Sequence, residues 1–309
     1  MNVTGSEEAA RLRRITIGTF MAFTNVAVFC GNYLAVASFC INSKLHTVTN
    51  SFIVSMSVGD LLIALVCIPS LLLANLYGPQ VPTGVIYCQF SISITVSLMG
   101  VAIGNLALNS FDRYRVILYP LKSDVTKRHV CWKIILAWLF AFVFGFLPYF
   151  GWGRLPNVRK TDETLYCQVR ANLSWNYTLA FLCLAGTPFS LMGVAYWRIL
   201  TTARRHTKVI VADAARFHGS KRVDFIKETR AAKLVGAILA AFMICYLPLF
   251  VIVIVDLSTN GLNSHAYVGG VLMATINSAI NPFIMAAMNR EYRHTFYRVA
   301  RCRWRKTRD

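Results

Sequence analysis

Seven long apolar runs constrain this chain more than any other feature of its sequence. Each run carries at most one charged residue and is long enough to cross the hydrocarbon core of a bilayer, which takes about 20 helical residues. Inside a bilayer the backbone polar groups have no water to bind, so a continuously apolar run of this length must be helical. We therefore predict an all-α membrane protein: a single domain over residues 1–309 that forms a seven-transmembrane helix bundle.

The predicted spans are built on these runs, and several of them continue past the run into charged residues. They cover residues 15–42, 48–76, 85–118, 131–150, 173–205, 222–256 and 264–287. Beyond the last span, residues 289–302 place Tyr292, Phe296 and Val299 at helical spacing among arginines. That pattern predicts a short amphipathic C-terminal helix lying on the anionic lipids of the inner leaflet.

The composition argues against a soluble protein. Only 15% of the residues are charged and 56% are hydrophobic, whereas about a quarter of the residues in a soluble domain are charged. The formal net charge of +19 would suggest a nucleic-acid partner in a soluble protein. Here the basic residues lie between the apolar runs, so we expect no nucleic acid and interpret them as a topology signal.

The same basic residues predict the orientation. With the amino terminus outside, 25 of the 32 Lys and Arg residues fall in cytoplasmic segments. The positive-inside rule then favours an extracellular amino terminus and a cytoplasmic carboxyl terminus, in the plasma membrane. Arg11, Arg13 and Arg14 beside the first span argue the other way, but the total outweighs them. We expect no cleaved signal peptide.

Three kinds of covalent modification are predicted from position. Cys88 and Cys167 both fall on the outer face, where the oxidising environment permits a disulfide. Asn2 and Asn172 begin glycan acceptor patterns in outer segments. Cys302 lies in the basic tail and is a palmitoylation candidate, with an ordinary tail thiol as the alternative.

One carboxylate lies deep in an apolar run. Asp60 is costly at that depth and is expected to face the bundle interior, where Asn277, Ser278 and Asn281 of the last span can meet it. Two interpretations are open: a hub of hydrogen bonds, which we favour, and a sodium ion bound at Asp60. We expect no other cofactor and no metal-ligand cluster.

Each span also carries one short motif, and the set is more specific than any member. In order, the motifs are Asn32, Asp60, Asp112-Arg113-Tyr114, Trp138, Pro188 with Tyr196, Pro248, and Asn281-Pro282. Over essentially its whole length the chain therefore resembles the rhodopsin-like (class A) G-protein-coupled receptors, and Cys88 with Cys167 matches the outer disulfide of that family. The resemblance implies a receptor that couples to a heterotrimeric G protein and is not an enzyme.

Within that family, the cytoplasmic side looks like that of adenosine receptors. The similar stretches cover residues 42–52, 198–205, 231–233 and 281–293. The ligand pocket is not carried over, because Val253, Phe250, Thr275 and Val169 stand where adenosine receptors have their recognition residues. Thr95 stands where amine receptors have an acid, and Thr275 stands where opsins have a lysine. The resemblance thus implies the frame of the receptor and leaves its ligand open.

We place the ligand site in the outer half of the bundle, under the loop that carries Cys167. Its candidate residues are mostly apolar and uncharged, which favours a neutral, lipophilic small molecule. They are Thr95, Met99, Val169, Tyr246, Phe250, Val253, Tyr267 and Thr275. The alternative is that these residues only pack the bundle, in a receptor that depends little on a ligand.

The resemblance also implies a switch at the inner end. Its residues are Asp112, Arg113, Tyr114, Tyr196, Glu228, Asn281 and Pro282, and the connector above it is Ile103, Pro188 and Phe242. An ion pair between Arg113 and Glu228 would hold spans three and six together at rest, and breaking it would free Arg113 for a G protein. The alternative is that Glu228 is a solvated surface charge, and exposed pairs contribute little.

Three residues depart from the family pattern. Tyr246 stands where a tryptophan is usual, Met285 where a tyrosine is usual, and Asn109 puts an amide one turn above Arg113. The usual tyrosine shares a water with Tyr196 in the active state, so we predict weakened or altered coupling. These departures keep a second function open, a receptor-like partner that heterodimerises without signalling, and we also consider homodimers. A transporter or an intramembrane enzyme would need more buried charges or a catalytic cluster.

Overall fold

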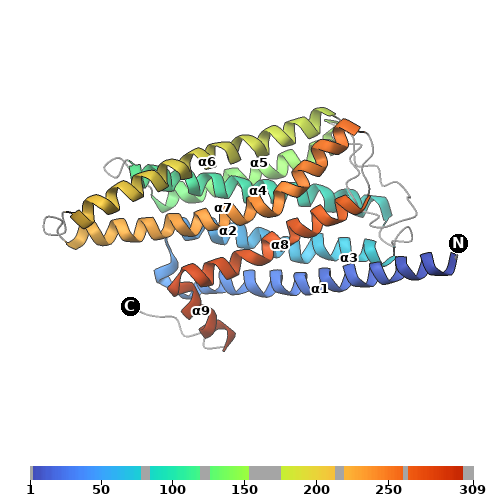
Figure 1. The fold of residues 1–309 in the computed structure, drawn as a ribbon, viewed down its shortest axis with the longest axis horizontal. Helices are drawn as coiled ribbons and strands as arrows, with labels where there is room; N and C mark the ends of the chain where they lie inside the picture. Colours follow the sequence, from blue (N-terminus) through green and yellow to red (C-terminus); the bar gives the residue numbers. More distant parts are fainter. Residues whose placement is uncertain are drawn as a thin grey trace.

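The computed structural model describes residues 3–77, 84–118, 126–152, 175–212, 219–259 and 264–301. Within these ranges almost every residue is helical and no strand occurs. Seven of the helical segments are long and apolar enough to cross a membrane, with mean hydropathies of 1.5 to 2.9. They lie side by side as one elongated bundle (Figure 1). The prediction of an all-α, seven-span protein is confirmed.

The elements follow the predicted order. The bundle consists of α1 (Val3–Ile41), α2 (Val48–Leu62), η2 (Ile63–Cys67), α3 (Ile68–Tyr77), α4 (Gly84–Leu118), α5 (Lys127–Phe146), α6 (Trp175–Ala212), α7 (Gly219–Thr259) and α8 (Ser264–Met288). Two short 3₁₀ turns, η1 (Ser43–Leu45) and η5 (Leu147–Phe150), follow α1 and α5, and α9 (Arg290–Ala300) follows α8. The second predicted span is therefore built from α2, η2 and α3, and the fourth from α5 and η5.

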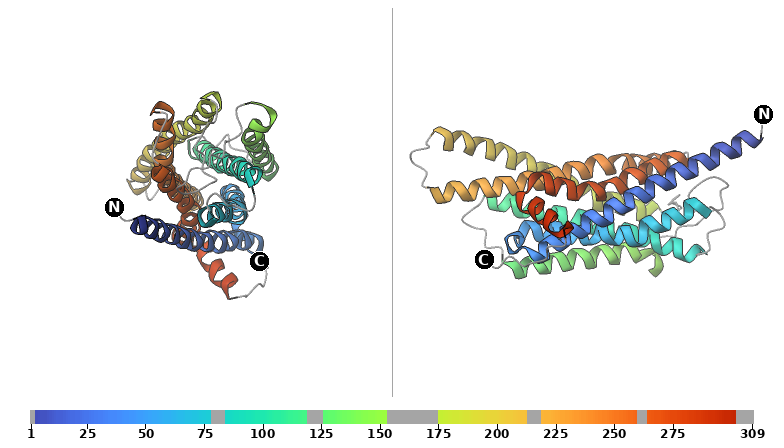
Figure 2. Two further views of the ribbon diagram at one scale, coloured as in Figure 1. Left: turned by 90° about the vertical axis from the view of Figure 1, so that its right-hand side faces the viewer. Right: turned by 90° about the horizontal axis from the view of Figure 1, so that it is seen from below.

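Two helical features differ from the predicted spans. The first helix begins at Val3 and not near residue 15, because the segment before the apolar run is rich in Glu, Ala and Arg, which are good helix formers. Figure 2 shows this end of α1 projecting beyond the other helices. The second span contains a π-helical turn at Ile63–Cys67. Pro69 follows one residue later, and its missing N–H leaves the carbonyl of Leu65 without its usual helical donor.

The centre of the bundle is α4, which contacts α2, α5, α6 and α7. On the α5 side, small residues allow the backbones to approach closely. A Cβ at Gly145 would overlap Ser97 Oγ, and one at Gly100 would lie 3.1 Å from Ala141 Cβ. Lipid is as apolar as a leucine side chain, so such close packing is a main source of helix association in a bilayer.

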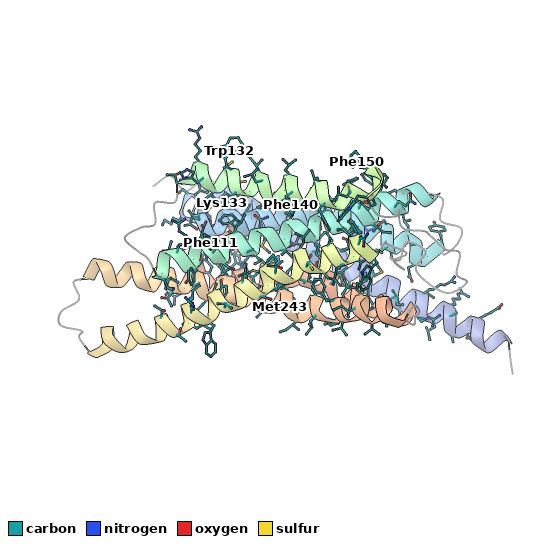
Figure 3. All side chains as sticks on the ribbon, turned by 90° about the horizontal axis from the view of Figure 1, so that it is seen from above. Phe111, Trp132, Lys133, Phe140, Phe150 and Met243 are labelled. Carbon is teal, nitrogen blue, oxygen red and sulfur yellow. The ribbon has the colours of Figure 1, made fainter. Side chains whose placement is uncertain are left out.

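The opposite face of α5 points away from the bundle. Trp132 and Phe140 on α5 and Phe150 in the following η5 are all more than half exposed, and Trp132 projects outward in Figure 3. Large exposed apolar residues of this kind are expected on a surface that contacts lipid chains and not water.

The short helix α9 is amphipathic, as predicted. The Asn289 side chain caps it by accepting a hydrogen bond from the backbone N–H of Glu291 at 3.0 Å. Its apolar face, however, packs on the protein: Tyr292 is fully buried in the main core. Asn42 at the end of α1 also donates from Nδ2 to the hydroxyl of Thr295 at 2.9 Å. The side chains expected to face the inner leaflet thus anchor α9 to α1.

Candidate functional site

The predicted polar residues of three helices meet in the middle of the bundle. Asp60 on α2 is only 5% exposed, and its Oδ2 accepts a hydrogen bond from Nδ2 of Asn281 on α8 at 3.1 Å. The Ser278 side chain also faces this carboxylate. Asn32 on α1 donates to the backbone oxygens of Val28 and Ser278, at 2.9 and 3.0 Å. We refer to this group as the polar hub; it connects α1, α2 and α8.

Several buried amide oxygens in and below the hub have no hydrogen-bond partner among the described residues. They are the Oδ1 atoms of Asn32, Asn105, Asn109, Asn277 and Asn281. An unsatisfied buried acceptor costs about 1–3 kcal/mol. A carboxylate with several oxygen acceptors around it matches the preferences of ordered water and of hard cations alike. These oxygen atoms therefore fit both interpretations of Asp60, the hub of hydrogen bonds and the bound sodium ion.

Next to the hub, α1 touches the proline kink of α8. A Cβ at Gly31 would lie 2.8 Å from Cγ of Pro282, closer than side-chain carbon atoms approach. Gly31 thus lets the two helices come together where the neighbouring Asn32 reaches across to Ser278. The position of the hub depends on this contact.

At the inner end of α4, Asp112 has a partner that the sequence analysis did not name. Lys133 Nζ on α5 donates to Asp112 Oδ1 at 2.7 Å. Asp112 is fully buried and Lys133 is 29% exposed. Figure 3 shows Lys133 on the side of α5 that faces α4, with Trp132 pointing the opposite way. In the sequence Lys133 was counted with the cytoplasmic basic residues, although it directly precedes the fourth apolar run.

Arg113 lies next to Asp112 and is also buried, at 5% exposure. Tyr196 on α6 faces Arg113 and Ser110, and its ring packs on Gly236 of α7, where a Cβ would lie 2.9 Å from the ring. Tyr114 accepts a hydrogen bond from Arg198 Nη1 at 3.4 Å. At this end α6 thus meets α4 at Arg113, and α7 packs on Tyr196 of α6.

The unusual residues near the switch are buried. Asn109 is fully buried and donates from Nδ2 to the backbone oxygen of Thr49 at 3.4 Å, which connects α4 to α2. Met285 is fully buried in the main core together with Tyr292 of α9. A tyrosine at position 285 would have to bring its hydroxyl into this apolar contact or turn toward Tyr196.

Two of the three connector residues lie in one cluster. Ile103 and Phe242 both belong to the main core. The α6 residue seen in contact is Phe189, whose ring centroid lies 5.3 Å from that of Phe242; it directly follows the predicted Pro188. Tyr246 stacks on Phe242 with centroids 4.2 Å apart and an interplanar angle of 18°. A displacement of Tyr246 is thus transmitted directly to Phe242.

The predicted ligand residues are not all in similar surroundings. Met99, Tyr246 and Phe250 pack in or against the main core, and the Phe250 ring lies 6.0 Å from both Phe181 and Phe189. These contacts fit residues that only pack the bundle, and they equally fit residues that form the floor of a ligand site.

The other described ligand candidates are less deeply packed or are already hydrogen-bonded. Val253 is half-buried, and the Thr275 hydroxyl donates to the backbone oxygen of Leu272 at 2.8 Å. Thr95 is exposed, and its hydroxyl donates to the backbone oxygen of Ser91 at 2.8 Å. The position at which amine receptors have an acid is therefore accessible in this chain and carries no charge.

Some predicted residues cannot be placed. Asn2, Cys167, Val169, Asn172 and Cys302 lie outside the described residues, and the side chains of Cys88, Glu228 and Tyr267 are not described although their helices are. The disulfide, the glycans, the palmitate and the lock between Arg113 and Glu228 therefore stay predictions. Among the side chains that are described, no three His, Cys, Asp or Glu residues group as metal ligands.

Comparison with known proteins gives one consistent result. The family model of the 7 transmembrane receptor (rhodopsin family) matches residues 31–285, which is well over half of the chain. Histamine H2 receptors of Canis lupus familiaris and Homo sapiens are each 28% identical to it, over 298 and 300 residues, covering 94% of this chain and 80% of theirs. The 5-hydroxytryptamine receptor 4 of Cavia porcellus is 27% identical over 327 residues, covering 97% and 83%.

Proposed function

The chain belongs to the rhodopsin family of seven-transmembrane receptors, and we propose that it transmits the binding of a neutral, lipophilic small molecule to a heterotrimeric G protein. As a member of this family it is a multi-pass plasma-membrane receptor and not an enzyme. We place its amino terminus outside and its carboxyl terminus inside, in agreement with the distribution of basic residues.

The proposal that the ligand is uncharged rests on Thr95. Histamine and 5-hydroxytryptamine, named in the relatives, carry an ammonium group at neutral pH, and such a group is costly to bury without an acid. In this chain the exposed Thr95 offers a hydroxyl at the place where an acid would be expected. We therefore propose that the ligand differs from those of the relatives, while the cytoplasmic side keeps its likeness to adenosine receptors.

In the proposed mechanism, the ligand acts on aromatic side chains. It contacts Tyr246 and Phe250, whose rings pack against Phe242 and Phe189. Closely packed interiors respond to such pressure by changing between discrete arrangements and not by continuous deformation. A shift of Phe242 past Ile103 would move the inner half of α7 relative to α4.

At the inner end the proposed switch depends on which cation holds Asp112. Lys133 lies 2.7 Å from Asp112 and already neutralises its carboxylate. Asp112 therefore restrains Arg113 less than the acid of an ordinary acid-arginine pair would. The proposed resting lock to Glu228 then becomes the main restraint on Arg113. Release of this lock exposes Arg113 to the carboxyl-terminal helix of the G protein.

If a sodium ion is bound, the polar hub is the place for it. Asp60, Ser278 and Asn281 would hold the ion, which would supply positive charge to a buried carboxylate. Without it, the same residues connect α1, α2 and α8 through hydrogen bonds. We favour the second arrangement, in which Asn281 supplies a donor to Asp60.

The experiment is a ligand screen read out by nucleotide exchange. Purified receptor is combined with each class of G protein and exposed to neutral lipophilic compounds and, separately, to amines. We expect stimulation by a neutral compound and none by amines. Stimulation by an amine that depends on an acid elsewhere in the chain would contradict the proposed ligand class.

A second function, a heterodimerisation partner that does not itself signal, is favoured by one observation. Met285 is fully buried in apolar contacts. Because methionine has no hydroxyl group, it cannot make the water-mediated contact to Tyr196 that a tyrosine would make. In that case no ligand would stimulate exchange by the receptor alone, but co-expression would change signalling by a second receptor.

A further inference from the structure

A cavity of about 530 Å³ lies between the inner halves of α6 and α7. Its walls are apolar, and its described lining residues come from α6, α7 and the last turn of α8; they include Ile199, Leu200, Ala232, Leu239, Met243 and Met288. The lining also includes Tyr196, which faces Arg113, and Gly236, on which the Tyr196 ring packs. The cavity therefore adjoins the switch described above.

The cavity opens to the side of the bundle. Leu200, Ala240 and Met243 line it, and all three are exposed on the surface that faces lipid. Met243 is labelled in Figure 3, near the middle of the bundle. Any molecule that enters by this route comes from the membrane and not from the cytoplasm.

The part of the cavity between Lys233 and Met243 has about the length of half a bilayer. These two lining residues are ten positions apart on α7, a rise of about 15 Å along a helix. The hydrocarbon core of a bilayer is about 30 Å thick, so one leaflet contributes about 15 Å. A single acyl chain that enters from the inner leaflet would extend from Lys233 to Met243.

The inner end of the cavity is cationic. Lys233 lines it and is exposed, and Arg230 is exposed one turn before it on α7. Thr229 also lines the cavity, and its buried hydroxyl has no hydrogen-bond partner among the described residues. An ammonium group and a free hydroxyl donor four residues apart can together bind one phosphate group.

We propose that this cavity binds one anionic phospholipid of the inner leaflet. One acyl chain lies between α6 and α7, and the phosphate pairs with Lys233 and accepts a hydrogen bond from the Thr229 hydroxyl. The inner leaflet is rich in such lipids, and a basic residue at its surface contributes about a fivefold preference for them. This site is separate from the proposed ligand site in the outer half of the bundle, and Tyr196 of the switch forms part of its wall.

The test is native mass spectrometry of the full chain released from bilayers of equal parts phosphatidylglycerol, phosphatidylcholine and cholesterol. We expect one phosphatidylglycerol to be retained in preference to the other lipids. Lys233→Gln should lower this retention about fivefold. Ala240→Phe should abolish it, because a phenyl ring at this exposed lining position obstructs the path of the acyl chain without disturbing the core.

Arg128→Gln is the matched control, since Arg128 is an exposed cation at the inner end of α5, away from the cavity. It should retain phosphatidylglycerol as the wild type does, and the melting temperature of each variant shows whether it is folded. The proposal is overturned if phosphatidylcholine or cholesterol is retained equally well, if Arg128→Gln has the same effect as Lys233→Gln, or if folded Ala240→Phe keeps the lipid.

Discussion

Replacing Lys133 by methionine is the most informative single change at the switch. It keeps most of the length and apolar contact of the side chain and removes the charge that pairs with Asp112 at 2.7 Å. Asp112 is fully buried, so water cannot solvate its carboxylate once the lysine is removed. The nearest remaining cation along the chain is the neighbouring Arg113, which is itself buried.

The size of the effect follows from burial. Removing one partner of a fully buried ion pair costs about 3–5 kcal/mol. Lys133 is 29% exposed, so solvent screens the pair, and we reduce the cost to about 2 kcal/mol. If Asp112 recovers this energy by binding Arg113, the ratio of the resting to the active population rises by up to about 30-fold. Basal signalling should therefore fall.

The assay is ligand-independent nucleotide exchange on purified G protein, together with the melting temperature of the receptor. Lys133→Met should lower basal exchange several-fold, and Lys133→Arg should retain it because the cation is kept. Lys127→Met, at an exposed position on the same helix, is the control for the loss of a positive charge. Equal exchange in Lys133→Met and the wild type, or a rise in Lys133→Met alone, would refute the reasoning.

Three further predictions concern the hub and the departures from the family pattern. Met285→Tyr should strengthen both basal and stimulated exchange by restoring a hydroxyl that can reach Tyr196; unchanged exchange in both conditions counts against this role. Gly31→Val should lower the free energy of unfolding by about 1–3 kcal/mol, measured by thermal unfolding, because its side chain overlaps Pro282. Asp60→Leu should cost a similar amount by removing the acceptor for Asn281, and replacing NaCl by choline chloride should leave the wild-type melting temperature unchanged. A sodium-dependent melting temperature that Asp60→Leu abolishes would favour the ion instead.

The sequence was sufficient for the number and order of the spans, because length and continuous apolarity leave a membrane segment few alternatives. It also placed Asp60 opposite Asn281, since polar groups in a span must find one another across the bundle. The start of α1 was missed because apolarity marks the membrane and not the end of the helix. The charged segment before residue 15 continues the helix beyond the apolar run.

The partners of individual side chains were harder to predict. The pairing of Lys133 with Asp112 depends on how far around α5 the lysine points, and the sequence places it equally well in the loop. The contact of Phe189 with Phe242 was not predicted, although Phe189 directly follows the predicted connector residue Pro188 on α6. The apolar face of α9 was identified from its spacing, but the same spacing fits a lipid surface and a protein surface, and Tyr292 packs on the protein.

The most direct test of the central claim is nucleotide exchange with the wild type and with Arg113→Ala, on purified G proteins of every class. The claim is that Arg113, on α4 beside Tyr196 of α6, connects this receptor to a G protein. We predict exchange by the wild type with at least one class, basal or stimulated by a neutral lipophilic compound, and its loss in folded Arg113→Ala. No exchange with any class, or equal exchange by both proteins, would contradict the account.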